Sequence, residues 1–207
     1  GPSRTARLDA LAAGRLGGVA VVIEDLLDPH NYGAVLRSCE AMGALHVFSI
    51  NTRHRFRVSP RVTQGCERWL DVHTFGDAAS CVAALHNRGF RLLAAVPGAS
   101  LSVEDIESAH PRAPIALAFG NEHLGLSHEL RALADGAFSI PMTGASQSLN
   151  VSVSVAVSLF AATSARRRAL GRPGDLSPDE ELALRARYYA ADVRGAEGIV
   201  ERSLRER

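Results

Sequence analysis

The chain has 207 residues, of which 46% are hydrophobic and 22% are charged, and its formal net charge is +1 at pH 7. These values are ordinary for a soluble globular protein, and the length suits one domain with short extensions. No apolar run approaches the roughly 18 residues of a membrane span, and no signal peptide precedes the first apolar segment. The three cysteines are far apart without metal-binding spacing. We therefore expect reduced thiols, a cytoplasmic protein, no membrane contact and no metal site.

The basic residues are all arginines, and the chain contains no lysine. Genomic base bias is the ordinary explanation. The near-neutral net charge does not by itself indicate a nucleic-acid-binding protein. Any contact with phosphate must come from arginine side chains or backbone amides, and arginine favours bidentate contacts.

Predicted strands alternate with predicted helices along the chain. Residues 19–23 form a continuous apolar, β-branched run, which predicts a buried parallel strand that ends at Glu24 and Asp25. Asn31 is a good N-cap for a helix that ends at Gly43. Further strands are expected at 45–50, 91–96, 115–119 and 138–140, and further helices at 8–14, 77–86, 127–133, 178–189 and 196–205. This alternation predicts an α/β fold with a parallel sheet flanked by helices.

The segment after Asn150 gives conflicting signals. Residues 151–157 alternate with a period of two, as in a strand. However, the stretch carries no charge until Arg166, which is long for a strand, and basic residues before Gly171 are typical of a helix C-terminus.

Three segments carry the strongest functional signal. They are Asp28-Pro-His-Asn31 with Arg37, then Phe119-Gly-Asn-Glu122, and finally Ile140-Pro-Met with residues 147–152. In this order they resemble the signature motifs of the SpoU class of RNA ribose 2′-O-methyltransferases, and within it the TrmH-like enzymes that modify a guanosine in the tRNA D-loop. The resemblance implies a C-terminal deep trefoil knot, a helix after Asn150, and a homodimer that builds each RNA site from both subunits.

The resemblance also implies S-adenosylmethionine as the methyl donor. A GxGxxG pattern after the first strand is absent, so an ordinary Rossmann dinucleotide site is not expected. We expect Gly120 to let adenosine approach the backbone, because glycine has no side chain. The cofactor-binding positions that the resemblance implies are Ala95, Val96, Gly120, Ile140, Met142, Ser148 and Leu149.

Arg37, Asn31, Glu122 and Asn150 are the catalytic candidates that the resemblance implies. A guanidinium group almost never releases its proton, so Arg37 is better suited to grip a phosphate and polarise the 2′-hydroxyl than to act as a base. The alternatives stay open: Arg37 as a solvated helix residue, Asn31 as a helix cap, and Glu122 as a solvated carboxylate. His30 is first a turn residue.

A basic loop between residues 51 and 61 is the candidate RNA arm, although a solvated loop is equally consistent with it. Its arginines are Arg53, Arg55, Arg57 and Arg61. The arginines of the C-terminal helices suit either an RNA-facing or a solvated surface.

The expected organisation is an N-terminal tag scar and short helical extension (residues 1–18), a methyltransferase domain (19–170) and a C-terminal helical extension (171–207). The expected substrate is tRNA. The alternatives are a 2′-O-methyltransferase acting on ribosomal RNA and a non-catalytic RNA-binding assembly factor.

Overall fold

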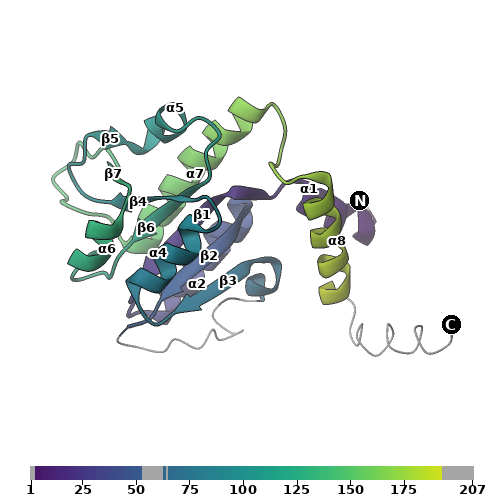
Figure 1. The fold of residues 1–207 in the computed structure, drawn as a ribbon, viewed down its shortest axis with the longest axis horizontal. Coiled ribbons are helices and arrows are strands. Elements are labelled where there is room, and N and C mark those ends of the chain that lie inside the picture. Colours follow the sequence, from purple (N-terminus) through teal and green to yellow (C-terminus); the bar gives the residue numbers. More distant parts are fainter. Residues whose placement is uncertain (1–2, 53–62, 64, 193–207) are drawn as a thin grey trace.

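The computed structural model describes residues 3–52, 63 and 65–192. Within them, seven parallel strands form one sheet in the order β3-β2-β1-β6-β4-β7-β5 (Figure 1). The strands are β1 (Leu16–Glu24), β2 (Ala44–Ile50), β3 (Asp71–Phe75), β4 (Arg91–Ala95), β5 (Leu101–Ser102), β6 (Ile115–Phe119) and β7 (Gly136–Ser139). The helices are α1 (Arg4–Ala13), α2 (Pro29–Met42), α4 (Ala78–His86), α5 (Ile106–Ala109), α6 (His128–Leu133), α7 (Val151–Leu170) and α8 (Pro178–Asp192), with the short 3-10 turns η1 (Cys66–Trp69) and η2 (Val103–Asp105). The predicted parallel α/β sheet is confirmed.

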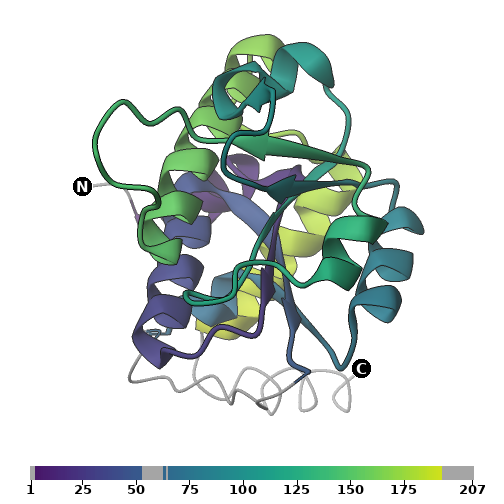
Figure 2. The ribbon, with the colours of Figure 1, turned by 90° about the vertical axis from the view of Figure 1, so that its left-hand side faces the viewer.

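Helices cover both faces of the sheet, as Figure 2 shows. Val19, Val21 and Ile23 of β1 pack with residues of α2 and α7 on one face. Ala20 and Val22 of the same strand pack with residues of α4 and α6 on the other face. Because both faces are buried, β1 is a continuous apolar run rather than an alternating one.

The ambiguous segment after Asn150 is a helix, α7, and Asn150 is its N-cap. Val151, Val155 and Leu159 are buried at a spacing of four residues, which matches one helical face. Val153 and Val157 are exposed, so the period-two alternation of valine does not mark one buried face, and no strand forms there.

Some of the predicted boundaries were wrong. Helix α2 starts at Pro29 with Asp28 as its N-cap, and the Asp28 carboxylate accepts a hydrogen bond from the His30 N–H at 2.8 Å. Asn31 is therefore not the cap. Strand β1 begins at Leu16, and the short elements β5, η2 and α5 were not predicted. The expected helix 196–205 lies outside the described residues. Of the basic arm 51–61, only residues 51 and 52 are described, so all four of its arginines lie outside as well.

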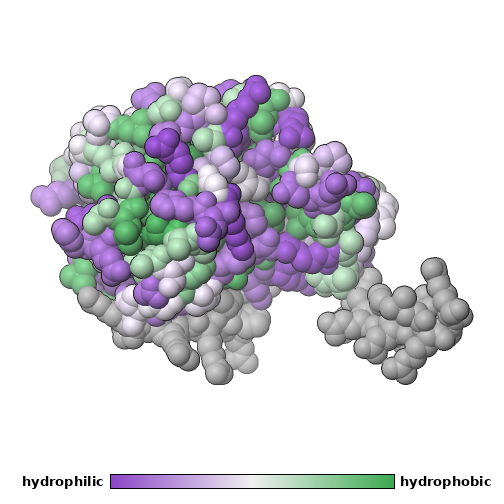
Figure 3. All heavy atoms as spheres, viewed as in Figure 1, coloured by the Kyte–Doolittle hydropathy of each residue, from purple (hydrophilic) through white to green (hydrophobic). Residues whose placement is uncertain are grey.

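Helices α1 and α8 pack together beside the sheet, at the right of Figure 1. Their shared core contains Leu8, Ala12, Leu184 and Tyr188, together with Leu45 of β2. No helix among the described residues is long and apolar enough to cross a membrane. On the face shown in Figure 3, hydrophobic residues lie in separate patches between hydrophilic ones.

Two arginines that are only 1% exposed join segments that are distant in the sequence. Arg15 donates hydrogen bonds to the Tyr188 hydroxyl at 2.9 Å and to the Glu40 carbonyl at 2.8 Å. Arg166 forms an ion pair with Glu107, with Nε and Oε2 2.6 Å apart, and also donates to the Ala113 carbonyl. Each buried guanidinium group therefore has acceptors that compensate for its lost hydration.

We expect Arg166→Met to lower the free energy of unfolding by about 3–5 kcal/mol, because Glu107 would keep a buried charge without its partner. Urea denaturation measures this change. Arg168→Met is the matched control, since Arg168 is exposed on the same helix. Equal stability of the two variants would contradict the role given to the Arg166–Glu107 pair.

Candidate active site

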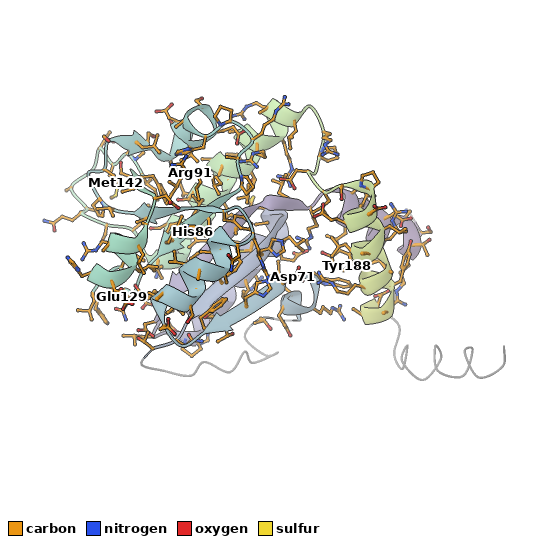
Figure 4. All side chains as sticks on the ribbon, in the orientation of Figure 1. Asp71, His86, Arg91, Glu129, Met142 and Tyr188 are labelled. Atoms are coloured by element: carbon orange, nitrogen blue, oxygen red, sulfur yellow. The ribbon has the colours of Figure 1, made fainter. Side chains whose placement is uncertain are left out.

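A cavity of about 440 Å³ lies at the carboxyl ends of β4, β6 and β7. This is the edge at which parallel α/β sheets place their ligand sites. Its wall comes from three segments: residues 95–97, 119–126 and 138–154. All the predicted cofactor positions lie in this wall, namely Ala95, Val96, Gly120, Ile140, Met142, Ser148 and Leu149. Figure 4 shows Met142 in the loop that follows β7.

The loop after β6 is held by its own backbone and by Asn121. Asn121 and Gly125 exchange two backbone hydrogen bonds of 3.1 and 2.9 Å. The Asn121 side chain donates to the Asp25 carbonyl at 2.9 Å and accepts from the His123 N–H at 2.7 Å. The loop is therefore fixed to the end of β1.

Gly120 is required for a reason that differs from our expectation. A Cβ atom at this position would lie 2.1 Å from the backbone carbon of Gly125 and 2.1 Å from the backbone nitrogen of Leu126. The steric requirement therefore comes from the returning loop of the protein itself, before any adenosine approaches.

Three of the four catalytic candidates form one chain of hydrogen bonds. The Asn31 side chain donates to Glu122 Oε1 at 2.7 Å, and Asn150 donates to Asn31 Oδ1 at 3.2 Å. Asn150 Oδ1 also accepts from the Ser152 N–H at 2.8 Å, which caps α7. Glu122 and Asn150 line the cavity, and Asn31 joins them from α2.

Glu122 is held in its ionised form. Partial burial opposes ionisation, but hydrogen bonds from the Asn31 side chain and from the backbone N–H groups of Leu27 and Asp28 outweigh it, so its pKa lies below the ordinary value. The carboxylate thus places a negative charge beside the cavity.

Arg37 lies apart from this chain of hydrogen bonds. It is exposed on α2 and lines a different recess, with residues of α1 and η1. Six residues separate it from Asn31, which in a helix means about 9 Å along the axis and about 240° around it. Among the described residues, Arg37 forms no hydrogen bond with Asn31, Glu122 or Asn150. One copy of the chain therefore does not bring all four catalytic candidates together.

Similarity to known proteins identifies the family of this chain. A profile of the SpoU rRNA Methylase family matches residues 18–160. The tRNA (guanosine(18)-2′-O)-methyltransferase of Thermus thermophilus is 34% identical over 167 residues, which cover 81% of this chain and 85% of that enzyme.

The chain belongs to the SpoU methylase family.

Two solved structures of the family are also similar. The A. aeolicus TrmH/SpoU tRNA modifying enzyme is 27% identical with a TM-score of 0.77, and the match covers 92% of this chain and 98% of that one. The SpoU methyltransferase AviRb from Streptomyces viridochromogenes, solved in complex with the cofactor AdoMet, is 25% identical with a TM-score of 0.66, over 74% of this chain and 62% of that one.

The cavity has the features that S-adenosylmethionine requires. Its volume falls in the usual range for small-molecule sites, roughly 300–1,000 Å³. Apolar side chains of Ile140, Met142 and Leu149 provide surface for the adenine and the thioether chain, while Ser148 and Asn150 provide hydrogen-bonding groups. The ionised carboxylate of Glu122 complements a positively charged sulfonium.

Sequence reasoning missed two residues that support this site. Asn121 fixes the loop after β6, as described above. Glu24 is buried, and its carboxylate accepts hydrogen bonds from the Ser127 N–H at 2.7 Å and from the Ser127 hydroxyl at 2.6 Å. The position of Glu24 at the end of an apolar strand was the available signal, but its partner lies 103 residues away.

We expect Gly120→Ala to destabilise the protein by about 1–3 kcal/mol, because the added methyl group meets backbone rather than a flexible side chain. It should also weaken the binding of S-adenosylmethionine, since the same loop lines the cavity. Thermal denaturation and isothermal calorimetry measure the two effects. Gly76→Ala is the control, because nothing lies within 4 Å of a Cβ atom there and Gly76 does not line the cavity. Unchanged cofactor affinity in Gly120→Ala would contradict this account of the loop.

Proposed function

We propose that this protein transfers a methyl group from S-adenosylmethionine to the ribose 2′-oxygen of a guanosine in the tRNA D-loop. The observation that carries the proposal is the convergence of three separated segments on one cavity, with Glu122, Asn31 and Asn150 hydrogen-bonded in series at its edge. The tRNA enzymes among its relatives support tRNA as the substrate. Such an enzyme would act in the cytoplasm.

Asn31, Asn150 and Glu122 would orient the ribose relative to the methyl donor. S-adenosylmethionine supplies the electrophilic methyl group when bound. Asn31 and Asn150 fix each other and Glu122, so that the side chains beside the cavity need no reorganisation when the ribose arrives. Asn150 caps α7 through Oδ1. Its orientation is therefore set by the helix as well as by Asn31.

Arg37 would grip a phosphate of the RNA through a bidentate contact and polarise the 2′-hydroxyl, with the proton passing to that phosphate or to water. This role requires Arg37 to reach a cofactor cavity. Because it faces another recess of its own protomer, we propose that it serves the cavity of a second copy in a homodimer.

An apolar stripe on α7 supports the dimer. Val153, Val157 and Phe160 are 45%, 39% and 63% exposed, and their spacing of four and three residues places them on one helical face. Aliphatic and aromatic side chains in such a stripe would be buried by a second copy. We also propose that the chain from 119 to 170 forms the trefoil knot of the family, which is consistent with its loops lining a single cavity.

The test of the function is methylation of RNA in vitro with labelled S-adenosylmethionine. We expect incorporation into unmodified tRNA, at the 2′-oxygen of a D-loop guanosine, as mapped by resistance to alkaline cleavage. Ribosomal RNA should not be labelled. Labelling of ribosomal RNA alone would establish the alternative substrate, and binding of RNA without any labelling would favour a non-catalytic factor.

The shared site is tested by complementation between subunits. Arg37→Ala and Asn150→Ala, each alone, should be inactive. Co-expressed with different affinity tags and purified through both, they form heterodimers in which one cavity has an intact Asn150 and an intact Arg37 from the other subunit. We expect about half of the wild-type activity per dimer. Inactive heterodimers would contradict the assignment of Arg37 to the partner's cavity.

A further inference from the structure

A second recess, of about 610 Å³, surrounds Arg37. Its described wall comes from α1, α2 and η1, with Thr63 and Gly65 before η1, and it shares no residue with the cofactor cavity. Arg7 of α1, Arg37 of α2 and Arg68 of η1 all line it, together with Trp69. Three elements far apart in sequence thus bring three guanidinium groups and one indole ring to one concave surface.

Of the charged residues that line the recess, three are arginines and one, Glu40, is acidic. Arg7, Arg37 and Arg68 are exposed, and none of them forms an ion pair with another described residue. Two carboxylates near the recess are shared with other arginines. Glu40, which lines the recess, lies 3.3 Å from a guanidinium nitrogen of the buried Arg15. Asp192 is paired with Arg4 and also interacts electrostatically with Arg68 and Arg7.

Glu67 does not line the recess. Burial and then the nearby Glu67 and Glu40 carboxylates raise the pKa of Cys66, so these acids offset part of the charge of the three lining arginines. Among the lining residues the arginines still outnumber the one acid. The recess therefore presents a net positive surface, in a chain whose overall charge is only +1.

The walls of the recess are held in place from behind. The Tyr188 hydroxyl donates a hydrogen bond to the Trp69 carbonyl at 2.8 Å and accepts one from Arg15 at 2.9 Å. Arg15 in turn donates to the Glu40 carbonyl in the last turns of α2. Figure 4 shows Tyr188 on α8. These contacts join η1, α2 and α8, so the recess is preorganised rather than formed by loose side chains.

Trp69 gives the recess an aromatic surface. Its ring packs edge-on against Tyr188 with centroids 5.2 Å apart, and the Arg68 guanidinium lies 4.6 Å from its centroid. An indole with a stacked guanidinium, next to further arginines, is a combination that binds the bases and phosphates of single-stranded or looped nucleic acid.

We propose that this recess binds the RNA strand next to the target nucleotide, with Arg7 and Arg68 contacting backbone phosphates on either side of the phosphate held by Arg37. The Arg68–Trp69 pair provides the stacking surface for a neighbouring base. The inference rests on the proposed function, because it assumes that RNA is the substrate. It adds a binding surface built by α1 and η1 and kept in shape by α8.

Trp69 is the only tryptophan in the chain, so its fluorescence reports directly on the recess. The experiment titrates wild-type protein with an unmodified D-arm RNA hairpin, without cofactor. We expect the RNA to change the emission of Trp69 and to reduce its quenching by acrylamide. S-adenosylmethionine alone should change the emission much less than the RNA does, since within one protomer Trp69 does not line the cofactor cavity. If saturating RNA left the emission and quenching of Trp69 unchanged, or if inorganic pyrophosphate changed them equally, the assignment to an RNA strand would be overturned.

The arginines are tested by neutral substitutions, compared with a control that removes one arginine charge elsewhere on the surface. Arg7→Gln and Arg68→Gln should each weaken RNA binding about tenfold and reduce the slope of log K against log salt by about 0.7–0.9 per lost phosphate contact. Arg91→Gln removes the same charge from an exposed position at the start of β4 and should leave both values unchanged (Figure 4). Affinities of the recess variants equal to that of Arg91→Gln would refute the proposal.

The two proposals can fail separately. If the protein binds RNA with the expected response of Trp69 but transfers no methyl group, the proposed function fails and the recess stands. If it methylates tRNA while Trp69 and the recess variants behave like the control, the recess proposal alone fails. Far-ultraviolet circular dichroism and melting temperatures of Arg7→Gln and Arg68→Gln check that the exposed substitutions leave the fold intact.

Discussion

The carboxylate of Glu122 is the contact on which the site depends. Loops beyond the ends of parallel strands have no ladder of hydrogen bonds, so polar side chains must hold them. Glu122, from the loop after β6, accepts hydrogen bonds from Asn31 of α2 and from the Leu27 N–H after β1. Asn31 then holds Asn150, the N-cap of α7. One ionised group thereby fixes the relative positions of three segments that are distant in sequence.

Helix α2 connects this site to the recess around Arg37. Asn31, in the first turn of the helix, donates a hydrogen bond to Glu122 at the cavity. Arg37 lies on another face of the helix, in the recess that α1 and η1 also line. The helix end is held by the buried Arg15, which also contacts Tyr188 of α8. The C-terminal helix therefore supports the surface around Arg37 without contributing to the cofactor cavity. This arrangement explains why a helix outside the sheet domain carries a fully buried tyrosine.

Much of the fold could be predicted because buried parallel strands are apolar on both faces. The segments that line the cavity could be named because the motifs that resemble the family are local in the sequence. The features that could not be predicted depend mostly on tertiary contacts. Asp28 and Asn31 are both good caps, and Pro29 in the first turn favours Asp28. The constraint on Gly120 comes from Gly125 and Leu126 after the loop turns back. The short strand β5 is too brief to leave a periodic pattern, and the Arg37 recess joins three elements that no single motif spans.

A net charge of +1 is compatible with an RNA-binding protein, because several carboxylates make contacts inside the molecule whereas the arginines of the recess lie on its surface. Several carboxylates are engaged inside the molecule: Glu24 with Ser127, Glu107 with Arg166, and Asp175 with the N–H groups of Gly17 and Gly18. Acids that hold the fold together in this way screen little of the outer surface. Within the described part of the chain, Arg7, Arg37 and Arg68 form no ion pair and outnumber the one acid that lines their recess, so they set the local field there more than the overall sum does. The distribution of charge over the surface, rather than the net charge, therefore indicates an anionic partner such as RNA.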